Sequence, residues 1–187
     1  MLFRSGGLSL LTSATSIYNE ILRTRPQCLP LLYRGYLYDL RGEGRPGVGG
    51  HSGHRVPVYS YLAGKLSCRY VRNGIELGAG SSGNALTAED IALFDLIDEI
   101  ARRPAYCFTT DFNPGDIQIV NNHTTLHART DYIDHPEPQR RRHALRLWLN
   151  LVEGRPLAYD FSHRYGPESG RLGVPPVDRP PEHIAPS

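Results

Sequence analysis

The sequence predicts an α+β domain in which a jelly-roll sheet carries helical inserts. Short apolar stretches bounded by glycine, proline or asparagine recur along the chain, as expected for strands. Two longer stretches instead place apolar residues at helical spacing. The 187 residues, 40% of them hydrophobic, can enclose one core. We expect one domain over residues 1–173 and an extended proline-rich tail over 174–187.

The N-terminal half is expected to hold one helix and several strands. A strand over 8–12, after a Gly-Gly turn, leads into a helix that ends near Arg25 before a proline. Ser13 or Thr15 is expected to cap this helix. Its buried face should carry Ile17, Ile21 and Leu22. Further strands are expected over 32–40, 56–62 and 66–71, the last two joined by a turn at Ala63-Gly64.

The C-terminal half opens with the clearest helix of the sequence. Thr87 and Asp90 have the spacing of a capping box, and a proline follows at position 104. The apolar residues at helical spacing are Ile91, Phe94, Ile97 and Ala101. Glycine-rich segments over 42–54 and 78–84 are expected to be loops. The remaining core is expected to consist of strands over 106–110, 117–120, 124–129 and 143–152, with a turn at 113–116.

Composition excludes several classes of function. The formal net charge of +2 is too small to indicate a nucleic-acid surface. The three cysteines form no zinc motif, and their odd number argues against a disulfide framework, so a reducing cytoplasm is expected. No apolar run approaches the roughly 18 residues of a membrane span. The expected partner is a small-molecule substrate, and we expect no nucleic acid or membrane as a partner.

Chemistry-bearing side chains gather between residues 114 and 149. His127 lies in a predicted strand, and Arg142 and Arg146 lie in another, where the two-residue period points both guanidinium groups the same way. A planar guanidinium is suited to holding a carboxylate through two hydrogen bonds. A histidine nearby offers a neutral nitrogen to a metal ion. The pattern therefore indicates a place for a metal ion and a dicarboxylate together.

The run P-G-D-I-Q-I-V-N-N-H-T-T-L-H-A-R-T, followed by R-R-H-A-L-R-L-W-L, resembles the C-terminal signature of the TauD/TfdA (taurine-dioxygenase-like) Fe(II)/2-oxoglutarate-dependent oxygenases. Ser5-Gly6-Gly7-Leu8-Ser9 resembles the Gly-Gly-x-[Thr/Ser] strand of that family. The resemblance extends from about Ser5 to Leu157. It implies a double-stranded β-helix (jelly roll, cupin-like) with helical inserts.

The resemblance also implies roles for four residues. His127 matches the distal iron ligand. Arg142 and Ser9 match the residues that bind the far carboxylate of the co-substrate 2-oxoglutarate. Arg146 matches a residue that faces the anionic group of the prime substrate. The implied activity is hydroxylation or oxidative cleavage of a small organic substrate, with Fe(II) as cofactor.

One family feature is absent from the sequence. The family iron site needs a His-x-Asp/Glu pair about two dozen residues before the Gly-Gly-x-Ser strand, and Ser9 lies too close to Met1 for that. Only His135-Pro136-Glu137 has such spacing, in a loop that is variable in the family. We therefore expect the N-terminal strands to be missing and the chain to be inactive alone and prone to associate. The alternative is a non-catalytic remnant that binds a dicarboxylate or a partner.

Overall fold

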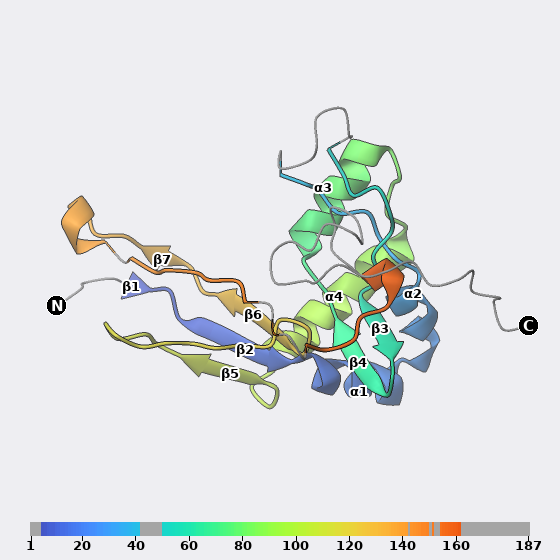
Figure 1. Ribbon diagram of the computed structural model, residues 1–187, viewed down its shortest axis with the longest axis horizontal. Coiled ribbons are helices and arrows are strands. Elements are labelled where there is room, and N and C mark those ends of the chain that lie inside the picture. Colours follow the sequence, from blue (N-terminus) through green and yellow to red (C-terminus); the bar gives the residue numbers. More distant parts are fainter. Residues whose placement is uncertain (1–4, 42–49, 142, 150, 152–153, 162–187) are drawn as a thin grey trace, which may run out of the picture.

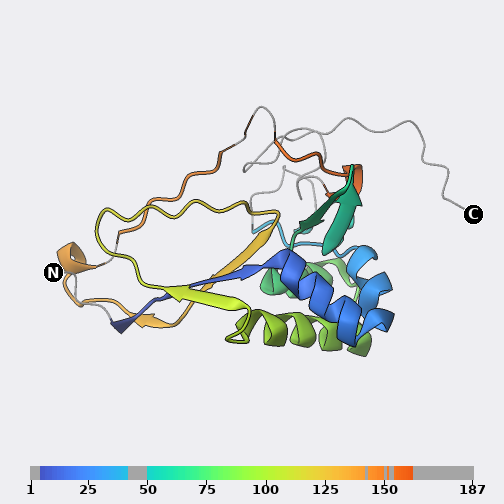
Figure 2. The ribbon, with the colours of Figure 1, turned by 90° about the horizontal axis from the view of Figure 1, so that it is seen from below.

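The computed structural model describes residues 5–41, 50–141, 143–149, 151 and 154–161. Helices and one hairpin form a body, from which a narrow antiparallel sheet projects as an arm (Figures 1 and 2). The α-helices are α1 (Ala14–Thr24), α2 (Leu29–Tyr33), α3 (Arg72–Ser82) and α4 (Ala88–Arg102). Short 3-10 turns are η1 (Pro26–Cys28), η2 (Pro138–Arg140) and η3 (Tyr159–Phe161).

The arm is built around β2 (Ser9–Ser13), which pairs antiparallel with β5 (Cys107–Thr110) on one side and β6 (Thr125–Arg129) on the other. At its far end β1 (Ser5–Gly6) pairs with β7 (Tyr132–Ile133). The three strands expected over 8–12, 106–110 and 124–129 are thus confirmed, each boundary to within one residue. A hydrogen bond connects the arm to the body: the Thr12 hydroxyl in β2 donates to the Ala101 carbonyl in α4 at 2.8 Å.

Helix α1 begins where the sequence predicts. Ser13 is its N-cap and accepts a hydrogen bond from the Ser16 amide. Ile17 and Ile21 are fully buried, as expected, but Leu22 is 47% exposed. The helical spacing places Leu22 at the edge of the apolar stripe rather than in it, so its predicted burial was wrong.

Helix α4 confirms the predicted capping box. The Thr87 hydroxyl accepts from the Asp90 amide, and the Asp90 carboxylate accepts from the Thr87 amide at 2.9 Å. Phe94 and Ile97 are buried, whereas Ile91 is 44% exposed. The buried stripe instead includes Leu93, because the helix presents that side to the body.

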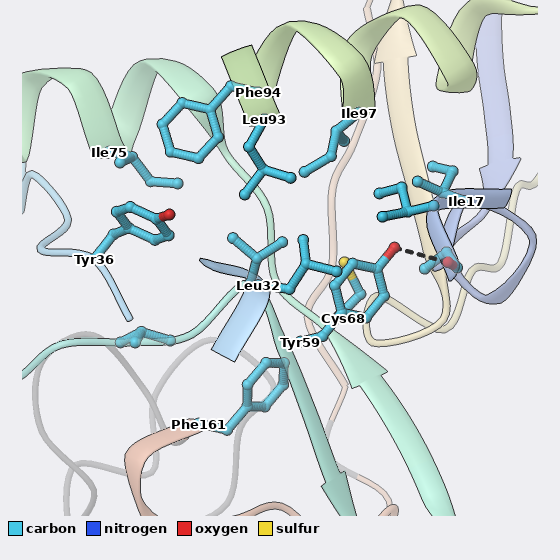
Figure 3. Close-up of a cluster of buried hydrophobic side chains, with 14 of the residues drawn as sticks. Ile17, Leu32, Tyr36, Tyr59, Cys68, Ile75, Leu93, Phe94, Ile97 and Phe161 are labelled. Carbon is cyan, nitrogen blue, oxygen red and sulfur yellow. Dashed lines mark hydrogen bonds between the residues drawn. The ribbon is translucent and has the colours of Figure 1, made fainter. Parts of the chain in front are cut away.

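The body contains the hairpin of β3 (Tyr59–Leu62) and β4 (Lys65–Cys68), with the predicted Ala63-Gly64 turn. Both turn residues have positive φ, which suits a two-residue hairpin loop. Side chains from this hairpin, all four helices and η3 form one buried cluster (Figure 3). Within it the Tyr59 hydroxyl donates to the Ala14 carbonyl at 2.7 Å, which satisfies a polar group that burial would otherwise leave unpaired.

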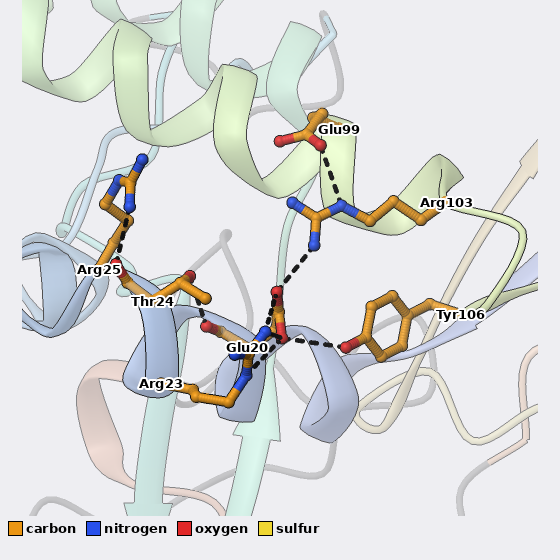
Figure 4. Close-up of polar contacts among 7 residues, drawn as sticks. All are labelled: Glu20, Arg23, Thr24, Arg25, Glu99, Arg103 and Tyr106. Carbon is orange, nitrogen blue, oxygen red and sulfur yellow. Dashed lines mark hydrogen bonds and ion pairs between the residues drawn. The ribbon is translucent and has the colours of Figure 1, made fainter.

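A buried carboxylate joins α1 to α4 and to the start of β5. Glu20 is only 5% exposed and accepts hydrogen bonds from Arg23, Arg103 and Tyr106 (Figure 4). The hydrogen bond from Arg23 is the largest influence that lowers the pKa of Glu20, and those from Arg103 and Tyr106 act the same way against the opposing effect of burial. The ionised carboxylate therefore fixes how α4 leads into the arm.

Two predictions for the body were wrong. Residues 32–40 were expected to form a strand, but Leu32 ends up in α2 and only isolated bridges occur at Tyr36 and Asp39. The glycine-rich segment 78–84 was expected to be a loop, but most of it belongs to α3. Gly78 packs directly against the backbone of residues 37–39, so its glycine serves close packing rather than flexibility.

The expected strands over 117–120 and 143–152 are also not found. Residues 117–120 and the described residues of 143–151 run alongside the arm without joining a ladder (Figure 2). Three separate antiparallel sheets are described, and they do not close into a jelly roll within the described ranges. The 174–187 tail and most of the 42–54 loop lie outside them. No helix in the described part has the length and apolar character needed to cross a membrane.

Candidate co-substrate and metal site on the open sheet face

A Gly-Gly turn places the start of β2. Gly6 and Gly7 have φ of 80° and 78°, which favours glycine. The Thr130 hydroxyl oxygen accepts from the amides of Gly7 (3.1 Å) and Leu8 (2.9 Å). A Cβ on Gly6 would lie 2.2 Å from the Asp131 carbonyl oxygen. The Gly-Gly motif and the Thr-Asp pair that follows His-Ala-Arg are therefore one local structure, although more than 120 residues separate them.

Ser9 begins β2 and is 8% exposed. Its hydroxyl donates to the Gln118 side-chain oxygen at 2.9 Å. Gln118 was missed as a site residue, although it lies in the Pro-Gly-Asp-Ile-Gln run, because a strand over 117–120 gave no reason for contact with β2. The Ser9 hydroxyl could therefore donate to a ligand oxygen in place of the Gln118 side-chain oxygen.

His127 lies on the same face of the sheet as Ser9. In the antiparallel ladder Ser9 is opposite Arg129 and Leu11 is opposite His127, so these four side chains share one face. Thr12 and Leu126 alternate to the other face, toward the body. Ser9 and His127 are diagonal neighbours, a relation that corresponds to roughly 7–8 Å.

Two influences lower the pKa of His127 below its ordinary value. The larger is loss of hydration, and the other is the positive charge of Arg146. A lowered pKa keeps the imidazole neutral near pH 7, the form in which histidine binds metal ions. The role of Arg146 in the site stays a prediction.

The remaining candidate residues are not all placed. Arg142 lies outside the described residues, so its position relative to Ser9 stays a prediction. His135 and Glu137 contact each other locally, because the Glu137 amide donates to the His135 ring nitrogen at 3.1 Å.

The described residues do not complete an iron site. No group of three or more His, Cys, Asp or Glu side chains among them is arranged to hold a metal ion. On the Ser9 face of the described sheet, His127 is the one side chain with a nitrogen suited to iron. The donor set visible here fits one position of a three-ligand site and no more.

Apolar side chains stand exposed beside this face. They alternate along two extended segments, which is the period of a strand with one apolar side. The exposed residues are Ile117, Ile119, Leu145, Leu147 and Leu149. These segments have the pattern of sheet strands without the ladder partners that would bury them.

Replacing Arg146 by alanine should raise the pKa of His127 toward its ordinary value, because a neighbouring positive charge is removed. The measurement is an NMR pH titration of the His127 ring signals. Arg102→Ala, on α4 behind the opposite face of the sheet, is the matched control and should leave the titration unchanged. An identical His127 titration in wild type and Arg146→Ala would show that Arg146 lies elsewhere.

Two known proteins are similar to this chain in sequence. The chain is 36% identical over 167 residues to FR-33289 synthase of Streptomyces rubellomurinus, covering 87% of this chain and 49% of that protein. It is 32% identical over 146 residues to the taurine hydroxylase-like protein SAT17 of Stachybotrys chartarum, covering 76% of this chain and 36% of that protein. The chain thus spans about half the length, or less, of these relatives.

The family comparison covers every residue of the candidate site. The matching segment begins before the Gly-Gly turn and ends after Arg146, so it includes Ser9 and His127. The sequence matches the model of the taurine catabolism dioxygenase TauD, TfdA family over residues 3–148, and the chain belongs to that family.

Proposed function

We propose that this chain carries the distal-histidine part of an Fe(II)/2-oxoglutarate-dependent dioxygenase site that acts on a small, anionic organic substrate. Membership of the TauD/TfdA family supports dioxygenase-type oxidoreductase chemistry in general. The observation that carries the proposal is the shared sheet face of Ser9 and His127. A hydroxyl donor and a guanidinium suit an anionic co-substrate, and a neutral imidazole suits one position on a metal ion.

Each residue has a distinct role in this proposal. His127 offers one iron ligand, and iron supplies the oxidative chemistry when bound. Ser9 and Arg142 anchor the far carboxylate of 2-oxoglutarate. Arg146 pairs with an anionic group of the substrate. The names of the two relatives, a synthase and a taurine hydroxylase-like protein, support a small molecule as substrate, and taurine itself carries an anionic sulfonate.

The second candidate is a non-catalytic module that binds a dicarboxylate or a partner. The observation that favours it is the incomplete donor set, since the described residues contain no three-ligand metal group. Both candidates keep the Ser9 and Arg142 carboxylate site. They differ in whether iron is held, so iron content separates them.

The test uses residues 1–187 and the Arg142→Ala and Arg142→Lys variants. Wild type should bind 2-oxoglutarate, and both variants should lose at least about tenfold in affinity, because a lysine point charge does not reproduce the guanidinium fork. Ligand-observed NMR detects such weak binding. Equal affinities in all three proteins would remove Arg142 from the site.

The same chain should hold little iron. A single imidazole binds Fe(II) weakly, and 2-oxoglutarate can coordinate the metal but supplies no protein ligand to it. Anaerobic addition of Fe(II) and 2-oxoglutarate, then exposure to oxygen, allows bound iron and succinate to be measured. Near-stoichiometric iron with succinate formation that depends on His127 would contradict this expectation. It would point to His135 and Glu137, or to a second chain, as the source of further ligands.

Compartment and assembly are part of the proposal. Cys28, Cys68 and Cys107 are free cysteines, and we place the protein in the reducing cytoplasm on the cysteine content of its sequence. The exposed alternating apolar residues beside the arm support self-association, because unpaired strand segments with an apolar side are templates for another chain. Light scattering of the purified chain reports on the association directly.

A further inference from the structure

Arg129 lies directly opposite the proposed carboxylate donor. It is the ladder partner of Ser9 across β2 and β6, and side chains of such partners start about 5 Å apart. It also follows His127 by two residues, so it shares the sheet face with both. No role for Arg129 was predicted from the sequence.

The Arg129 side chain packs on an aromatic ring and forms no ion pair with a carboxylate among the described residues. Its guanidinium carbon lies 3.9 Å from the centroid of the Tyr132 ring, a close cation–π contact. Arg34, Arg72 and Arg103 all pair with carboxylates. Among the described residues no carboxylate lies within ion-pair distance of Arg129. Tyr132 therefore orients a positive charge whose hydrogen-bond donors remain available to a ligand.

We infer that Ser9 and Arg129 form one clamp for the far carboxylate of 2-oxoglutarate, an inference that rests on the proposed function. Ser9 contributes a nearly buried hydroxyl donor, and Arg129 contributes a planar set of N–H donors. The charge of Arg129 favours an anionic ligand.

The spacing along β6 fits the length of this ligand. His127 and Arg129 are two residues apart, about 7 Å along a strand. A five-carbon dicarboxylate is long enough to extend from one of these positions to the other. The Ser9 hydroxyl currently donates to Gln118, so binding exchanges one acceptor oxygen for another without leaving the donor unpaired.

The test compares 2-oxoglutarate with 2-oxobutyrate, which lacks the far carboxylate. Binding of both to the full chain is measured by ligand-observed NMR at fixed ionic strength. Arg129→Ala should weaken 2-oxoglutarate binding at least about fivefold, because a charge-assisted contact is lost. 2-Oxobutyrate should bind detectably to neither wild type nor Arg129→Ala, because it offers no far carboxylate to the clamp and the chain holds little iron for its oxo-acid end. Arg129→Gln, which retains a stem over Tyr132, should behave like Arg129→Ala, and Arg102→Ala is the charge-matched control.

Three other results would contradict either the clamp alone or the clamp together with the proposed function. If wild type binds 2-oxoglutarate and Ser9→Ala weakens it while both Arg129 variants do not, the clamp is wrong and the proposed function stands. If wild type binds 2-oxobutyrate as tightly as 2-oxoglutarate, the far carboxylate contributes nothing to binding and the clamp is wrong. If wild type binds no 2-oxoglutarate, the proposed co-substrate and the clamp both fail.

Discussion

Replacing Gly78 by alanine is expected to destabilise the protein by about 2–3 kcal/mol. A Cβ at this position would lie 2.4 Å from the Leu37 carbonyl oxygen and 2.9 Å from the Asp39 amide nitrogen. Both are backbone atoms, so α3 and residues 37–39 must separate to admit the methyl group. The helix preference of alanine offsets only about 1 kcal/mol of this cost. Denaturant unfolding of both proteins measures the difference.

Gly80 provides the matched control in the same helix. A Cβ there meets nothing within 4 Å. Gly80→Ala should therefore stabilise the protein by about 0.5–1 kcal/mol, because it reduces the conformational freedom of the unfolded chain. The two substitutions should act in opposite directions. Equal effects would show that the packing of α3 against residues 37–39 does not determine stability.

Lowering the pH from 6.5 to 4 is expected to cost the folded state up to about 3 kcal/mol through His123 alone. Burial lowers the pKa of this histidine to about 4, with the charges of Arg69 and Arg155 acting in the same direction. The unfolded chain binds the proton near pH 6.5, whereas the folded protein does not bind it until about pH 4. Stability is therefore fully present above pH 6.5 and falls as the pH decreases through this interval.

The His123→Gln variant should lose part of this pH dependence, because glutamine cannot take up the proton. His54, whose pKa is lowered by burial and then by Arg69, contributes to the same acid loss and remains in the variant. Free energies of unfolding at pH 7.5, 5.5 and 4.5 give the two profiles, and the values at pH 7.5 isolate the packing cost. Parallel profiles would show that His123 does not titrate with folding.

Local elements of this protein were predictable wherever a few adjacent residues decide them. Ser13 and the Thr87–Asp90 pair cap their helices because their side chains reach amides within three residues. The Ala63-Gly64 hairpin follows from turn chemistry alone. The shared face of Ser9 and His127 was implied by the family resemblance, and the strand ladder supplies its register.

Other features depend on segments that are distant in the sequence. Gly78 belongs to a helix because residues 37–39 pack against it, and glycine content alone indicates a loop. Residues 117–120 have a strand pattern but no ladder partner, so their period alone did not decide their state. Gln118 reaches Ser9 across 109 positions, a contact that no local pattern specifies.

The sequence by itself determined the family, the helix caps, the central strands and the identity of His127 as a candidate ligand. These follow from residue order and from periods of two and 3.6 residues, which are local properties. Only the tertiary structure decided that Arg129 faces Ser9 and that Tyr132 orients it. Those relations depend on ladder register and on the paths of separate segments, which are fixed when the chain packs as a whole.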